Sequence, residues 1–150
     1  MTRKHNSKGR SKGEGRYLRL THFMMGTPAW RALSVYGRAA YVEVAAIYDG
    51  KNNGYLAMGV RRLQDAIGVS DKTATKALNE LVAKGFIEIA EDSGFNRKDR
   101  HSREFRLTDH PCDRTHQAPS KAFQHWRPEA PAAANDVADR QAPRAMSRAA

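Results

Sequence analysis

The longest apolar pattern in the chain lies in residues 35–48, an alanine-rich stretch without proline. Ala39, Val42 and Ala46 recur in it at helical spacing, which predicts a long core helix with these side chains facing inward. Ser34 stands directly before the stretch, and serine is a preferred N-cap because its hydroxyl oxygen accepts a hydrogen bond from the first helical turn. We therefore expect the helix to begin after Ser34.

A shorter helix is expected just upstream, over residues 28–33. Thr27 is a good cap, and a proline at the first helical position loses nothing because its missing N–H would have no partner there. Trp30, Tyr36 and Tyr41 lie at helical spacing across the two segments. This spacing is more typical of a hydrophobic core than of a cofactor-binding cluster.

A helix, a turn and a second helix are predicted farther along the chain. Residues 60–66 place apolar side chains on one face, and Gly68 interrupts the pattern where a tight turn needs a positive φ. Ser70 is the expected N-cap of a second helix over residues 71–84, and Gly85 is its stop signal. These signals predict two helices that cross at the turn.

The second of these helices has two distinct faces at about 100° per residue. Its apolar face consists of Ala74, Ala77, Leu78 and Leu81, and the opposite face carries Lys72, Thr75, Lys76 and Asn79, with Thr73 on the flank. Small alanines allow the first helix to cross closely, whereas the polar face offers donors and acceptors for base edges and phosphates. An ordinary solvated helix face is the alternative.

Alternating residues predict a small antiparallel sheet. Residues 17–20 form a short strand or an extended approach to the first helix, and residues 55–58, 86–90 and 103–108 are expected to be strands. The polar residues 91–102 are expected to form a hairpin loop between the last two strands. The predicted fold class is therefore mainly α with a small antiparallel β-wing, which is a winged helix-turn-helix.

The distribution of basic residues indicates what kind of partner the protein binds. The net charge is +10, and residues 1–20 hold seven basic residues against one acidic residue, which points to a polyanionic partner. The Gly/Ser-rich residues 1–16 cannot form a core, so we expect either a disordered arm that contacts phosphates or a minor groove, or a solubilising tail. The candidate DNA contacts are Lys8, Arg10, Lys12 and Arg16 in the arm, Arg61 and Arg62 in the first helix of the pair, and Arg97, Lys98 and Arg100 in the loop.

The domain is expected to span residues 17–108, followed by a mostly disordered tail over residues 109–150. Within the tail, residues 120–126 allow one helical turn, on which Phe123 and Trp126 are spaced three apart. These two side chains either pack back on the long helix or dock on a protein partner. The sequence leaves both possibilities open.

The sequence gives little support for a catalytic site or a metal site. Cys112 is the single cysteine, so an internal disulfide is excluded. His101, His110 and His116 match no closed zinc pattern, and no carboxylate pair suggests acid–base catalysis. We therefore expect no metal, no cofactor and no enzymatic activity. No apolar stretch is long enough to span a bilayer, and the expected location is cytoplasmic and nucleoid-associated.

Several segments resemble the winged helix domains of bacterial and phage transcriptional regulators and of plasmid replication initiators. The resemblance is carried by residues 30–34, 52–54, 65–74 and 77–87. It implies binding to double-stranded DNA, with the helix from Asp71 in the major groove. The chain departs from the pattern at Gly59, where such proteins often have a Ser or Thr cap.

The expected function is sequence-specific binding of double-stranded DNA by a repressor-like transcriptional regulator of a bacterial or mobile-element operon. The first alternative is a replication initiator or origin-binding accessory protein of a plasmid or phage. The second is a protein-interaction winged helix without DNA binding. A homodimer is compatible with the first two functions, while the target sequence and any effector stay open.

Overall fold

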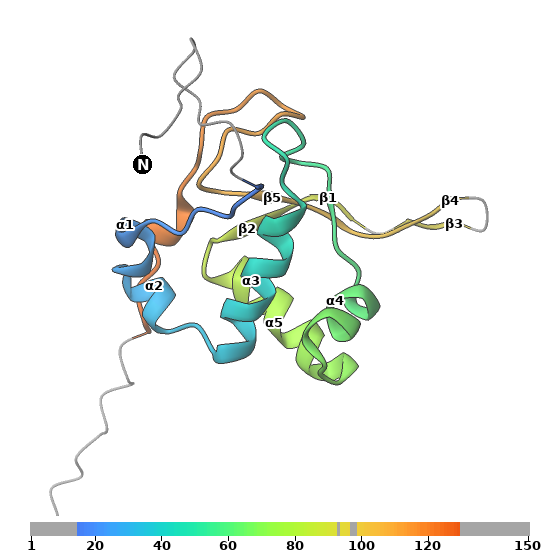
Figure 1. Cartoon of the computed structure of the whole chain (residues 1–150), viewed down its shortest axis with the longest axis horizontal. Helices are drawn as coiled ribbons and strands as arrows, with labels where there is room; N and C mark the ends of the chain where they lie inside the picture. The colour runs from blue at the N-terminus through green and yellow to red at the C-terminus, as the bar shows by residue number, and fades with distance from the viewer. Residues whose placement is uncertain (1–14, 93, 97–98, 130–150) are drawn as a thin grey trace, which may run out of the picture.

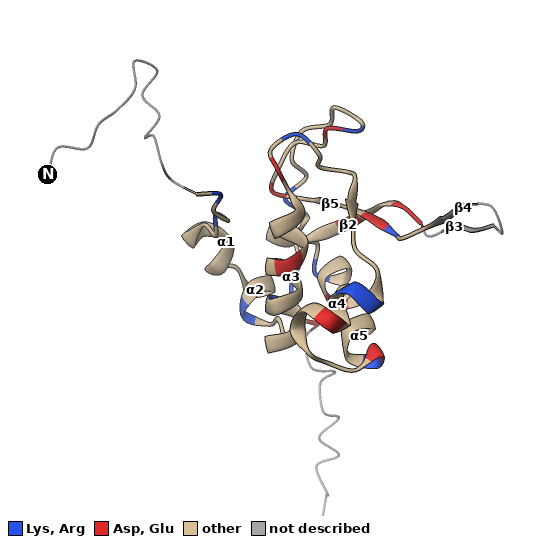
Figure 2. Cartoon of the chain, turned by 45° about the vertical axis from the view of Figure 1, so that its right-hand side comes forward, with Lys and Arg blue, Asp and Glu red and all other residues tan. Residues whose placement is uncertain are grey.

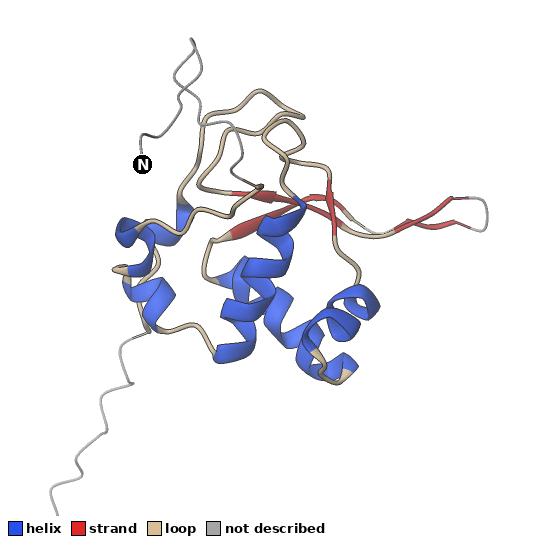
Figure 3. Cartoon of the chain, viewed as in Figure 1, coloured by secondary structure: helices blue, strands red, loops and turns tan. Residues whose placement is uncertain are grey.

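The computed structural model of the chain describes residues 15–92, 94–96 and 99–129 (Figure 1). Its elements are α1 (His22–Met25), α2 (Pro28–Arg31), α3 (Val35–Ile47), β1 (Leu56–Ala57), α4 (Val60–Ile67), α5 (Asp71–Ala83), β2 (Ile87–Glu91), β3 (Gly94–Asn96), β4 (Asp99–His101), β5 (Glu104–Leu107) and the 3-10 helix η1 (Ala122–Gln124). The described part of the chain is thus mainly helical with small antiparallel sheets, as predicted (Figure 3). None of its helices has the length and apolar character to cross a membrane.

The predicted helix boundaries are largely confirmed. Ser34, Thr27 and Ser70 each cap a helix, because each side-chain oxygen accepts a hydrogen bond from the backbone N–H three residues later, at 3.0, 3.2 and 3.3 Å respectively. Gly68 ends α4 with φ of +67°, as the turn requires. Gly59 makes no side-chain cap bond, which matches its expected weakness. The sequence analysis missed the single turn of α1.

The sheet brings together strands that are distant in sequence. Its order is β1-β5-β2, and all neighbours are antiparallel. Phe105 of β5 lies opposite both Leu56 of β1 and Ile89 of β2, so β5 is the central strand. A β-bulge follows Ile89, and beyond it the chain continues into the two-stranded sheet β3-β4.

The hairpin expected over residues 91–102 is present, but the expectation that the segment is a loop throughout is wrong. Strands β3 and β4 pair in this stretch, and the hairpin projects well away from the helices (Figure 1). The sequence pattern did not indicate these strands because the segment is polar apart from Gly94 and Phe95, so it lacks the alternation that marks a half-buried strand. The result is a long ribbon in place of a loop.

The face of α3 that forms the core is also different from the predicted one. Val42 and Ala46 are exposed, Val42 to 40%, and Ala39 is only half-buried. The buried residues of α3 are instead Gly37, Ala40, Tyr41 and Val44. An alanine-rich helix is apolar on several faces, so its periodicity alone does not select the one that packs.

Aromatic rings settle which face of α3 is buried. Tyr41 packs edge-on against Trp30 and Phe86, with ring centroids 5.6 and 5.8 Å apart. Such edge-to-face pairs stabilise a core beyond their burial of apolar area. The prediction that Trp30 and Tyr41 belong to the core is therefore confirmed, whereas Tyr36 is 51% exposed and lies outside it.

The segment after β5 is part of the folded domain up to the end of the described residues. Phe123 is 1% exposed and stacks flat on Phe86, with ring centroids 5.2 Å apart. Trp126 is half-buried beside Lys84. The expectation of disorder from residue 109 is thus wrong for residues 109–129, while residues 130–150 lie outside the described residues. Both aromatic residues pack back on the domain, but their contacts are with Phe86, Lys84 and α2 rather than with the long helix α3. Phe123 is not available to a protein partner because it is buried.

Asn53 ties this C-terminal segment to the rest of the fold. Its side chain is completely buried, and its Nδ2 donates to the carbonyls of Leu107, His110 and Pro111 at 2.9–3.2 Å. Its Oδ1 accepts a hydrogen bond from the backbone N–H of Leu107 at 2.7 Å. The turn expected at residues 52–54 therefore holds the end of β5 and the following loop through one buried amide.

Candidate nucleic-acid interface

The seam between α4 and α5 is built as the sequence predicts. Leu63 of α4 is fully buried, and α4 packs directly against α5. On α5, the residues expected to face the seam and the core, Ala74, Ala77, Leu78 and Leu81, are all buried. The small side chains allow the two helices to approach closely, which fixes the orientation of α5 on the domain.

The opposite face of α5 is polar and open to solvent. Lys72, Lys76 and Asn79 are exposed, whereas Thr73 and Thr75 are half-buried on its flanks. The Thr73 hydroxyl lies 3.0 Å from that of Ser70, the N-cap of α5. Within the described part of the chain, the three exposed side chains make no hydrogen bond or ion pair. Their donors and acceptors are thus available to an external ligand.

Two further cations lie on the first turn of α4. Arg61 and Arg62 are both exposed, and basic residues mark the start of this helix in Figure 2. Arg62 donates from Nη1 to the carbonyl of Ala57 at 3.2 Å, so part of its guanidinium is used within the fold. Arg61 has no such partner among the described residues. Arg61 is therefore the freer of the two.

The first turn of α3 lies beside α5, a relationship that the sequence did not reveal. Ser34, Tyr36, Thr73, Lys76, Ala77 and Glu80 line a shallow depression of about 430 Å³. Tyr36 is 51% exposed, and it lines this depression together with Lys76 of α5. The helical spacing had pointed to a core role for Tyr36, and no other sequence signal connected it with α5. We add Tyr36 to the candidate interface.

The segments that lead into the β3-β4 hairpin are charged, but their charges are largely paired. Arg103 pairs with Asp92 at 2.8 Å, and acidic and basic positions alternate where β2 and β5 leave the domain (Figure 2). Arg114 binds Glu104 at 2.8 Å and also contacts Glu91. The hydrogen bond and charge of Arg114 lower the pKa of Glu91, which keeps this carboxylate ionised. Arg103 and Arg114 are therefore engaged in ion pairs within the domain.

The remaining candidate cations belong to the β3-β4 hairpin and to the N-terminal arm. Arg100 is in β4, but its side chain lies outside the described ones, as do Arg97 and Lys98 altogether. Of the arm residues, Lys8, Arg10 and Lys12 lie outside the described residues. Arg16 is exposed and donates from Nη2 to the carbonyl of Tyr48 at 3.1 Å.

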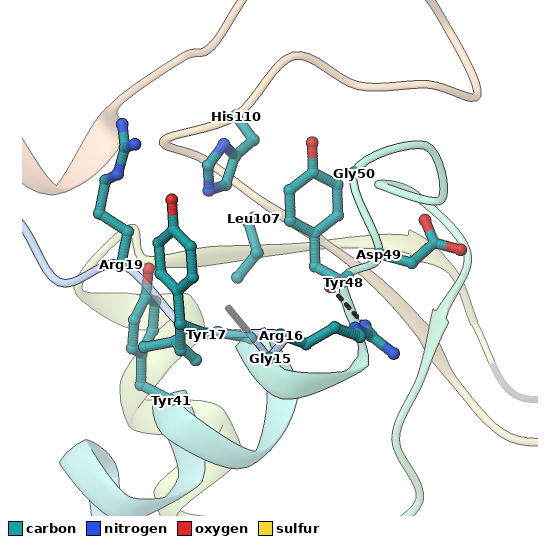
Figure 4. A pocket seen from close by; sticks show the side chains of 12 residues that line it. Gly15, Arg16, Tyr17, Arg19, Tyr41, Tyr48, Asp49, Gly50, Leu107 and His110 are labelled. Carbon is teal, nitrogen blue, oxygen red and sulfur yellow. Dashed lines mark hydrogen bonds between the residues drawn. The ribbon is translucent and has the colours of Figure 1, made fainter. Parts of the chain in front are cut away.

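A second depression lies on another side of the domain. It measures about 370 Å³ and is bordered by Tyr17, Tyr48 and His110, with Arg16 and Arg19 at its rim (Figure 4). The rings of Tyr48 and His110 pack with an interplanar angle of 31° and centroids 4.6 Å apart. No residue of α4 or α5 lines this depression, so it is separate from the candidate interface.

The His and Cys residues singled out from the sequence are dispersed. Cys112 is buried, with its Sγ 3.7 Å from the carbonyl oxygen of Asn53, while the His110 ring packs on Tyr48. Among the described residues, no group of three or more His, Cys, Asp or Glu side chains is placed to hold a metal ion.

Comparisons with known proteins identify no relative, so a function has to be argued from the geometry of the site. No protein-family model matches the sequence, and no significant match was found among curated proteins or solved structures. Among the described residues, the candidate interface thus consists of the exposed face of α5 together with Tyr36 at the start of α3 and Arg61 at the start of α4.

Proposed function

We propose that this chain binds double-stranded DNA through α5 and acts as a non-enzymatic transcriptional regulator with a winged helix-turn-helix domain. The element order α3, β1, α4, α5, β2, β5 supports the winged helix, with the α4–α5 pair as the helix-turn-helix and the β3-β4 hairpin as an extension of the wing. The proposal depends chiefly on one observation, the unpaired polar face of α5.

The dimensions and chemistry of α5 suit a major groove. The groove of B-DNA is about 12 Å wide and admits one α-helix. Asn79 and Thr75 offer hydrogen-bonding groups for base edges, and an asparagine amide pairs well with adenine. Lys72 and Lys76 supply positive charge for the phosphates along the groove. Each group would thus have a distinct role in affinity or in sequence readout.

The flanking elements would contact the DNA backbone. Arg61 on α4 and Tyr36 on α3 lie on elements to either side of α5, and both carry donors that suit phosphate oxygens. An origin-binding accessory protein would use the same surface, so the proposal concerns the contact itself and applies to both roles. A protein-interaction domain would not need lysines on this face.

Charge reversal on α5 tests the proposal. Lys72→Glu and Lys76→Glu should each lower the affinity for duplex DNA by tenfold or more, roughly, because each loses a phosphate contact and adds repulsion. Lys51→Glu is the matched control, since Lys51 is also exposed but lies in the loop after α3. Unchanged affinity in both α5 variants, measured by fluorescence anisotropy, would contradict binding through α5.

Selection of bound duplexes from a random pool tests sequence specificity. We expect enrichment of a defined motif, and we expect Asn79→Ala to relax the preference at one position of it. Loss of a bidentate base contact corresponds to about 1–3 kcal/mol of discrimination. If the pool shows no enrichment while affinity stays high, the protein contacts only the sugar-phosphate backbone of the DNA. The proposal of a sequence-specific regulator then fails.

A further inference from the structure

The outward face of α3 carries an apolar stripe that is largely exposed. It consists of Val35, Ala39, Val42 and Ala46, on the side of the helix opposite its buried face. Val35 is 77% exposed and Val42 is 40% exposed. Helix α3 stands between α2 and α4 (Figures 1 and 3), and of the four side chains only that of Ala39 is half-buried. Apolar side chains aligned on one exposed helical face are a feature of association surfaces.

The spacing of this stripe is that of a coiled-coil seam. Steps of four, three and four residues match successive d, a, d and a positions of a heptad. In this register Arg38 occupies a g position and Glu43 occupies the next e position. In a parallel two-stranded pair, a g residue of one helix lies beside the e residue five positions later on its partner. Opposite charges therefore meet on both sides of the seam.

We infer that α3 pairs in parallel with α3 of a second copy of this chain. Arg38 of each copy then faces Glu43 of the other, while valines and alanines alternate along the contact. Alanines at the a positions allow the helix axes to approach closely. An antiparallel pair would bring like flanks together, so that Arg38 would meet no carboxylate and Glu43 no cation.

The two charged side chains are free to make this contact. Arg38 donates from Nη2 to the carbonyls of Trp30 and Arg31, at 3.4 and 3.2 Å, which holds its guanidinium along the flank of α3. Its Nε and Nη1 have no partner among the described residues, and the same is true of the Glu43 carboxylate. Both groups are thus positioned beside the stripe with bonding capacity to spare.

A second copy fits the stripe better than the chain's own N-terminal segment. Of residues 1–14, only Met1 is apolar, and the segment carries five Lys or Arg residues. Such a segment has almost nothing to bury against four aliphatic side chains. The identical stripe on another copy is apolar along its whole length and brings the complementary charges with it.

The parallel direction also has a consequence for DNA, and this step rests on the proposed function. The basic face of α5 lies beside the first turn of α3, where Tyr36 and Lys76 share a depression. A two-fold axis parallel to α3 keeps both first turns at the same end of the dimer, so both α5 helices lie at that end. This is the arrangement that reads two half-sites of an inverted repeat.

Sedimentation equilibrium of the full chain without DNA tests the pairing. We expect a reversible monomer–dimer equilibrium in the wild type, weakened by about tenfold or more in Val42→Glu. Ile89→Glu is the matched control, because Ile89 is 43% exposed on β2 and should leave the equilibrium unchanged. A wild type that stays monomeric, or a Val42→Glu variant that associates as well as wild type, overturns the inference.

Charge exchange tests the direction of the helices. Arg38→Glu alone and Glu43→Arg alone each place like charges across the parallel seam, so each variant should dimerise less well than wild type. Mixing the two variants restores both opposite-charge pairs and should yield heterodimers. If the mixture associates no better than either variant alone, the parallel arrangement is wrong. Circular dichroism checks the folding of each variant, since Arg38 also bonds α2.

These measurements separate the pairing from the DNA-binding proposal. A dimer that forms through Val42 but binds no duplex contradicts the proposed function alone. A protein that binds duplex while Val42→Glu has no effect on association contradicts the pairing alone.

Discussion

The Glu80 carboxylate accepts hydrogen bonds from both the backbone N–H and the hydroxyl of Ser34, at 2.9 and 2.6 Å. The two residues are 46 positions apart, so this contact connects the N-cap of α3 with the second half of α5. Lys84 adds an ion pair to Glu80 at 2.8 Å. A carboxylate at a helix N-terminus is also favoured by the helix dipole. Glu80 therefore holds the proposed DNA-reading helix against the start of α3.

Replacing Glu80 with alanine should destabilise the fold by about 1–3 kcal/mol, because it leaves the N–H of Ser34 and the ammonium group of Lys84 without their acceptor. Urea unfolding at neutral pH measures the loss. Asp65→Ala is the control, since Asp65 is an exposed acidic residue on α4, and it should change the free energy of unfolding little. If the two substitutions lower the free energy of unfolding equally, the contact between Glu80 and Ser34 does not stabilise the fold.

The same contact should make stability depend on pH. Burial raises the pKa of Glu80, but hydrogen bonds from Lys84 and Ser34 outweigh it and lower the pKa below its ordinary value of 4.5. The folded pKa is thus lower than the unfolded one, so the stabilisation is complete above the ordinary value and is lost as the pH falls through the folded pKa. Wild type should lose more stability than Glu80→Gln on acidification below that value, as measured by thermal unfolding. Parallel curves would contradict this.

Gly85 and Gly68 form a matched pair for testing backbone strain against close contact. Both have positive φ, of +77° and +67°. A Cβ on Gly85 would lie 2.7 Å from the carbonyl carbon of Ala122, whereas a Cβ on Gly68 would meet no atom within 4 Å. We expect Gly68→Ala to cost about 1 kcal/mol from strain alone and Gly85→Ala about 3 kcal/mol or more, because it also displaces the segment that carries Phe123. Similar losses in urea unfolding would show that the segment does not press on Gly85.

Asn53 and Asn52 offer a similar contrast for a buried amide. Asn53→Ala leaves the carbonyls after β5 and the N–H of Leu107 without their side-chain partner, so we expect a loss of about 3 kcal/mol or more. Asn52 is only half-buried and donates to the carbonyl of Ile47, so Asn52→Ala should cost about 1 kcal/mol. The comparison is made by thermal unfolding. If the order of the two losses is reversed, Asn53 is not the main link between the turn and β5.

Salt dependence should count the phosphate contacts of each region. Lys72→Gln and Lys76→Gln should each reduce the slope of log K against log salt concentration by about 0.9 if each lysine neutralises one phosphate. Replacing Lys8, Arg10 and Lys12 with glutamine tests the arm by the same titration. An unchanged slope in the arm variant would assign these residues to solubility rather than to DNA contact.

Local features of this protein were predictable from its sequence. The caps at Thr27, Ser34 and Ser70 and the turn at Gly68 involve hydrogen bonds or φ values within a few residues, so the residue type alone indicates them. The two faces of α5 were also predictable, because leucines and alanines contrast sharply with lysines and asparagine along that helix. The candidate DNA-reading face therefore follows from local sequence.

Tertiary structure alone decided the features that depend on distant partners. Helix α3 is apolar on both sides, so only the rings of Trp30 and Phe86 around Tyr41 determine that Val42 faces outward. The contacts of Asn53 and of Glu80 likewise join segments far apart in sequence, and no local pattern encodes which groups will meet. Short-range bonding and periodicity thus indicated the longer helices and their caps, but not α1, β3 or β4. Long-range packing, which selects among faces of similar hydrophobicity, determined what each element buries and what it leaves exposed.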